Sequence, residues 1–350
     1  MNLKDKLTIS RDEPARNALQ RLTDLAMPGA ALFVLDKEGR VVGTLTDGDI
    51  RRALLGGSDV KTPLSEIANA NFRFLTEARP GAVFIDECRR FNIRYLPVLN
   101  AQQQLLSIID LNSIKGILPV EAVLMAGGKG ERLRPLTDDT PKPLLKVGGR
   151  PIIERNIERL ISYSISRFHI TVRYLGEKIE RYLGDGSTYN AVFSYLHEDH
   201  PLGTIGALRS IGSFSEENIL VMNSDLLTNI DFGDFYNFFV ESGADMVVAT
   251  VPYHVDIPYA VLETTDEQEV LSFLEKPRYT YYSNAGIYLL KKKLVDLVPA
   301  NEKFDATDLM EAVIAKGYKL KSYPVVGYWL DIGRMEDYRK AQEDVKHIQF

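Results

Sequence analysis

A glycine-rich segment with basic residues around it is the part of the sequence best suited to chemistry. Residues 124–132 read LMAGGKGER, and a Pro-Lys-Pro segment follows at 141–143. A strand that runs into glycines lets backbone N–H groups approach a phosphate closely, and Lys and Arg side chains add positive charge. We therefore predict a phosphate-binding site whose backbone and cationic parts are Ala126, Gly127, Gly128, Gly130, Arg132 and Lys142.

Two familiar glycine patterns do not fit this segment. A P-loop needs Ser or Thr after Gly-Lys, but Gly130 follows Lys129, and a dinucleotide fingerprint would need Gly where Leu133 stands. A kinase or a dehydrogenase is therefore disfavoured. The glycines alone could form only a tight turn, and it is the added charge of Arg132 and Lys142 that favours phosphate binding.

Residues 118–350 alternate short apolar runs with helical stretches, which predicts an α/β domain with a mostly parallel sheet covered on both faces. In such sheets ligands bind at the carboxyl ends of the strands. The expected strands are 120–125, 167–172, 192–196, 219–222, 246–251, 259–263 and 282–290, and the clearest helices are 151–163 and 232–241.

Residues 1–117 contain a weak internal repeat and form a separate expected domain of α+β type. Residues 30–50 and 95–114 both read as strand, turn, strand and helix start, and a helical stretch precedes each of them, at 13–25 and 79–91. We expect two modules, at about 1–62 and 63–117, that pack against each other because each is too small to bury much alone.

Composition limits the class of protein. The chain has 350 residues, a formal net charge of -6 and one cysteine, Cys88. The acidic balance argues against a nucleic-acid partner, and no apolar run is long enough to predict a membrane span. With no apolar signal core at the start and no internal disulfide possible, we expect a cytoplasmic protein.

Several segments in one order carry a family resemblance. They are the glycine-rich segment, PIIE at 151–154, LGTIGAL at 202–208, NSD at 223–225, FLEKP at 273–277, NAGIY at 284–288 and YWLDIG at 328–333. Together they resemble the sugar-1-phosphate nucleotidylyltransferases, which include glucose-1-phosphate thymidylyltransferases and mannose-1-phosphate guanylyltransferases. The resemblance implies a Rossmann-like, GT-A-like mixed sheet and a reaction that joins a sugar 1-phosphate to a nucleoside triphosphate with release of pyrophosphate.

The resemblance also implies roles for particular residues. Arg132 would stabilise the leaving pyrophosphate, Lys142 the triphosphate and Lys276 the sugar phosphate. The remaining positions would contact the nucleotide (Gly203, Thr204) or the sugar (Asn223, Glu275, Asn284 and the Gly286 backbone). One departure leaves the sugar open: many relatives have Pro-Tyr-Gly where this chain has Pro258-Tyr259-Ala260.

Asp225 and Asp331 are the expected ligands of Mg²⁺. Each follows an apolar strand-like run, and Mg²⁺ takes carboxylate together with phosphate oxygens. Either aspartate alone could cap a helix or occupy a turn, but both stand at strand ends and at family positions.

Glu198 stands where thymidylyltransferase relatives have a base-reading Gln. An ionised carboxylate only accepts hydrogen bonds, which suits the adjacent N1–H and amino group of guanine and not uracil or thymine. We therefore favour GTP, with specificity for dTTP or UTP as the alternative if Glu198 points into solvent.

The N-terminal repeat resembles a pair of CBS modules, a family that binds adenine nucleotides. Thr46, Asp47 and Asp49 match its ribose-phosphate pattern, whereas the second module has Ile109 and Asn112 at the equivalent positions. The resemblance implies AMP or ATP at the first module and makes a homodimer plausible, and a pair that only packs or dimerises is the alternative. A rival for the whole chain is a nucleotide-sensing protein with a catalytically retired transferase domain.

Overall fold

The computed structural model describes residues 3–27, 29–76, 87–88, 90–112 and 114–348. The chain divides into two compact units, Met1–Ile117 and Leu118–Phe350. Among the described residues, no helix has the length and apolar character that crossing a membrane requires.

Unit 1 contains two three-stranded sheets with the same connectivity. In each sheet the first strand pairs with the second in parallel, and the second pairs with the third antiparallel. The strands are β1 (Thr8–Ser10), β2 (Leu32–Leu35) and β3 (Val41–Leu45) in one sheet, and β4 (Leu75–Thr76), β5 (Tyr95–Leu99) and β6 (Leu105–Asp110) in the other. The helices are α1 (Leu3–Leu7), α2 (Ala15–Leu25), α3 (Asp47–Leu55) and α4 (Leu64–Ile67). The helix expected at 79–91 lies largely outside the described residues.

The two sheets of unit 1 share one apolar cluster. Phe33 and Val41 of the first sheet pack with Tyr95 and Leu99 of the second, and the N–H of Val41 donates to the carbonyl of Gln103 at 3.0 Å. The internal repeat therefore folds as two similar halves that bury each other's apolar surface.

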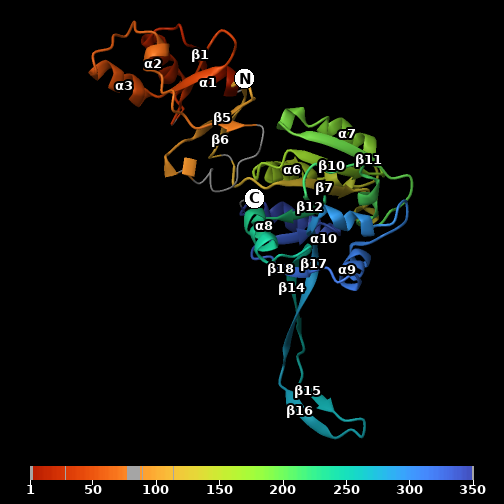
Figure 1. Cartoon of the computed structure of the whole chain (residues 1–350). Helices are drawn as coiled ribbons and strands as arrows, with labels where there is room; N and C mark the ends of the chain where they lie inside the picture. Colours follow the sequence, from red (N-terminus) through yellow and green to blue (C-terminus); the bar gives the residue numbers. More distant parts are fainter. Residues whose placement is uncertain (1–2, 28, 77–86, 89, 113, 349–350) are drawn as a thin grey trace. The chain divides into compact units, whose positions relative to one another are not determined.

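Unit 2 is built on a seven-stranded mixed sheet (Figure 1). The strand order is β11-β10-β7-β12-β17-β14-β18, and β17 alone runs opposite to the other six. The bounds are β7 (Val120–Ala126), β10 (Arg167–Val172), β11 (Val192–His197), β12 (Asn218–Asn223), β14 (Met246–Asp256), β17 (Arg278–Lys291) and β18 (Leu320–Pro324). The predicted α/β class and its mostly parallel sheet are confirmed.

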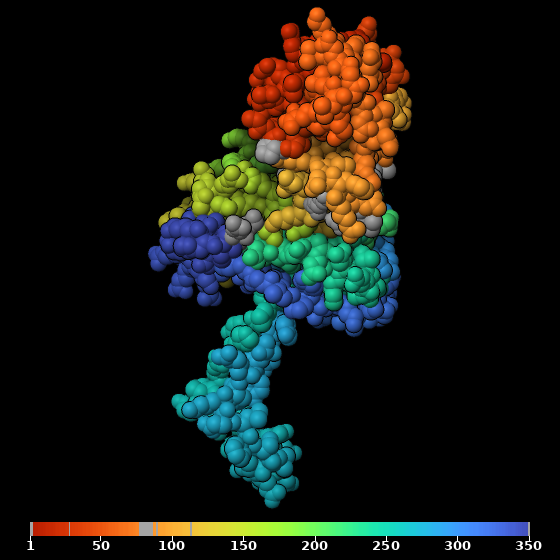
Figure 2. Space-filling model, turned by 90° about the vertical axis from the view of Figure 1, so that its left-hand side faces the viewer, coloured from red at the N-terminus to blue at the C-terminus, as the bar shows by residue number. Residues whose placement is uncertain are grey.

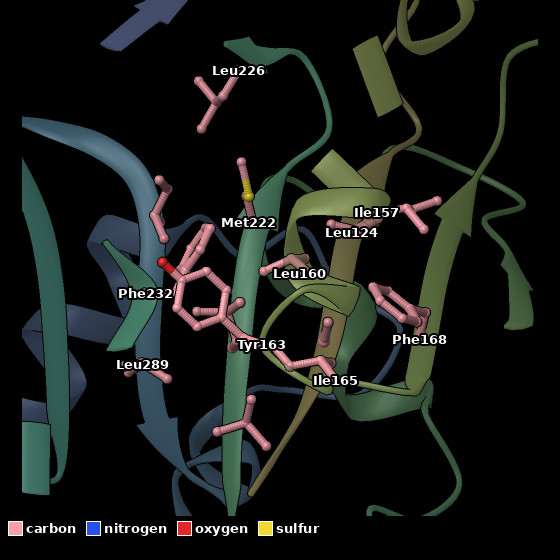
Figure 3. Close-up of a cluster of buried hydrophobic side chains, with 14 of the residues drawn as sticks. Leu124, Ile157, Leu160, Tyr163, Ile165, Phe168, Met222, Leu226, Phe232 and Leu289 are labelled. Carbon is pink, nitrogen blue, oxygen red and sulfur yellow. The ribbon is translucent and has the colours of Figure 1, made fainter. Parts of the chain in front are cut away.

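Helices cover both faces of this sheet, as alternation along β7 requires. Leu124 packs with Ile157 and Leu160 of α6 on one face (Figure 3), whereas its neighbour Val123 packs with Leu309 of α9 on the other face. Among the described residues, the α-helices of unit 2 are α6 (Ile152–Ile161), α7 (Gly176–Leu183), α8 (Phe232–Glu241), α9 (Ala306–Ala315) and α10 (Met335–Asp344). Because six strands end at one edge between these helical layers, that edge is the place for a ligand.

Two strands continue beyond the sheet. The pairing of β17 with β12 ends at Ile287 and that of β14 with β18 ends at Thr250, yet β14 and β17 stay paired as far as Asp256 and Arg278. We call residues 251–283 the arm; it extends from the body of unit 2 in Figures 1 and 2. The strand expected at 259–263 lies here, as β15 (Val261–Thr264), which pairs with β16 (Val270–Leu274) and not with the main sheet.

Candidate active site

A cavity of about 300 Å³ lies at the carboxyl ends of β7, β10 and β12. These strands are parallel neighbours, so the residues that follow them meet at one edge. The cavity is lined by Met125, Ala126, Gly127, Gly128, Lys142, Pro143, Thr171, Arg173, Glu198, Pro201, Gly203, Thr204, Asn223, Ser224 and Asp225. It therefore brings together most of the residues that the sequence singled out for nucleotide and metal binding.

Gly127 lets the backbone of the glycine-rich segment approach Glu198. A Cβ placed on Gly127 would lie 2.9 Å from Glu198 Oε1, whereas one on Gly128 would meet nothing within 4 Å. Gly130 then takes a positive φ of 66° and begins the 3-10 turn η1 (Glu131–Leu133), which carries Arg132. The segment thus turns sharply around the mouth of the cavity.

Lys142 is the buried cation of the site. It begins the 3-10 turn η2 (Lys142–Leu144) between two prolines and is 9% exposed. Its Nζ forms an ion pair with Asp225 Oδ2 and lies 3.7 Å from Asp331 Oδ1. One ammonium group therefore contacts both aspartates that the sequence predicted as metal ligands.

A short two-stranded sheet brings Asp331 to Asp225. Strand β13 (Leu226–Thr228) pairs antiparallel with β19 (Trp329–Asp331), and the N–H of Ile332 donates to the Asp225 carbonyl at 3.2 Å. Burial raises the pKa of Asp331, and the charge of Asp225 raises it further, while Lys142 and Arg132 oppose the shift. Arg132 lies at the same corner, since a Cβ on Gly333 would lie 3.4 Å from one of its guanidinium nitrogens.

The two aspartates fit Mg²⁺. Asp225 Oδ1 is buried and, within the described part of the chain, accepts no hydrogen bond, so it has a lone pair to offer a cation. No cluster of three or more His, Cys, Asp or Glu side chains with metal-binding geometry occurs among the described residues. Mg²⁺ commonly takes one or two protein carboxylates and completes its shell with phosphate oxygens and water, so two aspartates are enough protein ligands for it.

Glu198 lies in the cavity and not in solvent. It follows β11, its N–H donates to the Val172 carbonyl at 2.9 Å, and only 8% of its surface is exposed. The Leu202 N–H lies 3.4 Å from Glu198 Oε2, so Oε1 faces Gly127 and the cavity. A buried acceptor at this position can select a ligand by its N–H groups.

Gly203 and Thr204 line the cavity and also anchor its outer loop. The N–H of Thr204 donates to Asp305 Oδ1 at 2.9 Å, and its hydroxyl accepts from the Ala306 N–H at 2.8 Å. The loop is therefore fixed to the first turn of α9. No local pattern of residues points to Asp305, which lies far along the chain.

The residues expected around the sugar divide into two groups. Asn223 lines the cavity, and Gly286 lies beside it: a Cβ on Gly286, whose φ is 71°, would come within 2.5 Å of Asn223 Nδ2. Asn284 Oδ1 accepts from the Gly286 N–H at 2.9 Å, which stabilises the irregularity of β17 opposite Val248–Thr250. Glu275 and Lys276, in contrast, lie on the exposed arm, away from the cavity.

Arg173 is a cavity residue that the sequence analysis missed. It directly follows β10, and its buried Nε has no hydrogen-bond partner among the residues described. Its position after a predicted parallel strand was the available signal, because such residues face the ligand edge.

Thr46 and Asp49 of unit 1 form a reciprocal helix cap. The Thr46 hydroxyl accepts from the Asp49 N–H at 3.2 Å, and Asp49 Oδ2 accepts from the Thr46 N–H at 2.8 Å at the start of α3. Asp47 pairs with Arg51 at 2.7 Å. All three side chains are thus engaged locally at the first turn of the helix.

Comparison with known proteins agrees with this geometry. Residues 121–348 match the family model described as nucleotidyl transferase, and residues 3–56 match that of the CBS domain. The chain belongs to the nucleotidyl transferase family and carries a CBS domain at its N-terminal side. The recognised family, the fold class and the first CBS module are confirmed.

Two curated proteins and one solved structure are similar to this chain. A mannose-1-phosphate guanylyltransferase from Mycobacterium tuberculosis is 31% identical over 231 residues, covering 65% of this chain and 64% of that protein. A UTP–glucose-1-phosphate uridylyltransferase from Synechocystis is 28% identical over 254 residues, covering 66% of each. The chain thus spans just under two thirds of these two relatives. The crystal structure of HddC from Yersinia pseudotuberculosis aligns with a TM-score of 0.51 at 27% identity, over 65% of this chain and 99% of that one.

Proposed function

We propose that this protein is a Mg²⁺-dependent sugar-1-phosphate nucleotidyltransferase that favours GTP. The observation that carries the proposal is the buried Lys142 between Asp225 and Asp331, at the carboxyl edge of the sheet and beside the glycine-rich segment. This arrangement offers cations, two carboxylates and the backbone of the glycine-rich segment to a triphosphate.

The reaction needs positioning and charge rather than a protein nucleophile. A phosphate oxygen of the sugar 1-phosphate attacks the α-phosphorus in line, a P–O bond forms there, and the bond to the β-phosphate oxygen breaks to release pyrophosphate. Lys142 would hold the triphosphate, Arg132 the departing pyrophosphate and Lys276 the sugar phosphate. Mg²⁺ held by Asp225 and Asp331 would supply Lewis-acid stabilisation of the phosphate charge.

The preference for GTP is supported by Glu198. Its buried carboxylate can accept from the N1–H and amino group of guanine, whereas the carbonyls of uracil or thymine would face it with repulsion. The mycobacterial relative is a guanylyltransferase, and the Synechocystis relative uses UTP. A Glu198→Gln variant should therefore weaken GTP use and improve relative use of dTTP and UTP.

Pyrophosphate release tests the function directly. GTP, UTP, dTTP, CTP and ATP are each combined with glucose, mannose, glucosamine and N-acetylglucosamine 1-phosphates in the presence of Mg²⁺. We expect pyrophosphate release with GTP and at least one of the sugar phosphates. Pyrophosphate release with UTP or dTTP in place of GTP would overturn the base assignment alone. No release in any combination, with or without AMP or ATP as effector, would favour the nucleotide-sensing alternative.

We propose in addition that adenine nucleotide binds unit 1 and tunes the activity. The support is the match of residues 3–56 to the CBS domain and the polar cluster of Thr46 and Asp49. Calorimetric titration of the full chain with AMP and ATP should detect binding that Asp49→Ala removes. Equal heats in both proteins would leave Thr46 and Asp49 as a helix cap only.

A further inference from the structure

The arm is a two-stranded ribbon with unlike faces. Paired residues point the same way in antiparallel strands, so Tyr253 and Tyr281 share a face with Val255 and Tyr279. The opposite face carries the ion pair between Asp256 and Arg278 at 2.6 Å. The first face is therefore aromatic and aliphatic, whereas the second carries Pro252 and the exposed Tyr282 near the sheet and becomes polar towards the ion pair.

The distal part of the arm is also apolar and exposed. Leu262 pairs with Phe273, and these side chains are 56% and 67% exposed; Leu271 and Leu274 nearby are 64% and 55% exposed. Isolated two-stranded ribbons are marginally stable in water, and contiguous apolar patches of this kind mark interaction surfaces. The exposed apolar side chains of the arm are therefore typical of a surface that packs against another protein surface.

The arm carries a cation that its own cavity cannot use. The extended strand between Asn284 and Arg278 spans about 20 Å, and Lys276 lies beyond it. Within the described ranges, Lys276 makes no hydrogen bond or ion pair, and it is held at a positive φ of 45°. Strain at a non-glycine residue is retained where it has a use.

The cavity, in turn, has little positive charge to offer a sugar phosphate. Its buried ammonium, Lys142, is already engaged by Asp225 and Asp331, and Glu198 adds a third carboxylate. Arg173 also lines the cavity and Arg132 lies at its corner, but two phosphate-bearing substrates would still need positive charge near Asn223 and Gly286. The arm leaves the sheet at the same edge as the cavity and extends away from the body of unit 2 (Figures 1 and 2). A second arm could therefore reach the cavity from another molecule.

We propose that two copies of this chain exchange arms, so that Lys276 of each completes the cavity of the other. The exchange is reciprocal and closes as a two-fold dimer, because swapping identical elements buries the same surfaces twice. The apolar face of the arm packs on the partner's body, and the ammonium group meets the sugar phosphate. This inference rests on the proposed function for its catalytic part but not for the exchange itself.

Complementation between two inactive variants tests the catalytic part. Lys276→Ala and Asp225→Asn chains are co-expressed: a mixed dimer pairs the intact cavity of the first with the intact arm of the second. Random assortment should restore about a quarter of wild-type activity. The control pair Asp225→Asn with Lys142→Met places both defects in the cavity and should restore none. A test mixture as inactive as its components, beside an active wild type, would show that the arm serves its own chain.

Cross-linking tests the exchange without relying on turnover. A Lys276→Cys chain is labelled with a benzophenone maleimide and irradiated; the native Cys88 is buried, and a Cys88→Ser background removes it. We expect a covalent dimer with cross-links to cavity residues such as Pro143. Labelling at the exposed Ile314 through Ile314→Cys should give no such product. Cross-links confined to one chain, or to another protein in place of a second copy, would overturn the proposal.

Discussion

The cavity and the arm both carry segments of one sequence signature, but their side chains are stabilised in opposite ways. Lys142 and Glu198 are held in the cavity by burial and by contacts within the chain. Phe273 and Lys276 are exposed and make few contacts within it. A shared signature therefore marks residues that are proposed for one reaction without showing that one molecule brings them together.

The largest effect should come from Asp225 and Asp331, the proposed metal ligands of the cavity. Asp225→Asn removes one of two carboxylates and should lower kcat on the order of 10³-fold, as the loss of a key charge-stabilising group does. Steady-state pyrophosphate release at saturating Mg²⁺ measures it. Asp139→Asn, on an exposed loop, is the matched control and should retain wild-type turnover. Full activity of the Asp225 variant would refute the metal assignment.

One substitution applied to both regions sharpens the contrast in packing. Phe168→Ala empties a site that is 1% exposed and should lower the free energy of unfolding by about 3–5 kcal/mol. Phe273→Ala, on the arm, should change it by less than about 0.5 kcal/mol in dilute protein. Urea unfolding at low concentration measures both. A large cost for Phe273 there would mean that the arm is packed within its own chain.

Variants of the adjacent residues Gly127 and Gly128 compare the effect of close packing against Glu198 with that of a Cβ in open space. Gly127→Ala forces a Cβ to within 2.9 Å of Glu198, whereas Gly128→Ala adds one in open space. We expect kcat/KM for GTP to fall about 10-fold or more in the first variant, since displacement of a positioning group by an ångström is costly, and little in the second. Equal losses in both would argue that the backbone, and not Glu198, sets the approach of the nucleotide.

The smallest effect is expected at Asp245, which precedes β14 at the end opposite the arm, and it concerns the dependence of stability on pH. Burial alone would raise the pKa of Asp245, but hydrogen bonds from Lys293, the Lys319 N–H and Lys291 lower it well below its usual range. The carboxylate therefore stabilises the fold above the unfolded pKa near 4, and this contribution is lost as pH falls through the folded value. Asp245→Asn should cost about 1–3 kcal/mol at pH 7 and should flatten the loss of Tm in acid.

Much of the sheet and of the cavity could be predicted because local patterns suffice there. The strand expected at 167–172 has the observed bounds of β10, and Lys142, Glu198, Asn223 and Asp225 come together because parallel strands end at one edge. Contacts between distant loops, such as Thr204 with Asp305, leave no local pattern.

The arm shows what pattern alone cannot specify. Residues 259–263 form a short apolar run that is typical of a strand, but such a run does not say whether the strand pairs within the main sheet or beyond it. The left-handed backbone conformation at Lys276 could not be predicted either, because Glu-Lys-Pro is compatible with several turns. For Thr46 and Asp49 the same residues serve a helix cap and a ribose pattern, and only binding data separate the two.

The antiparallel pairing of β13 with β19 also has a consequence for protein synthesis. Asp225 and Lys142 lie in the part of unit 2 that leaves the ribosome first, and domains begin to fold in that order. Asp331 is added only after the arm and α9 have been made. A nascent chain can therefore carry most of the parallel sheet while it still lacks one of the two proposed Mg²⁺ ligands, so the proposed phosphate chemistry has to wait until β19 has been translated.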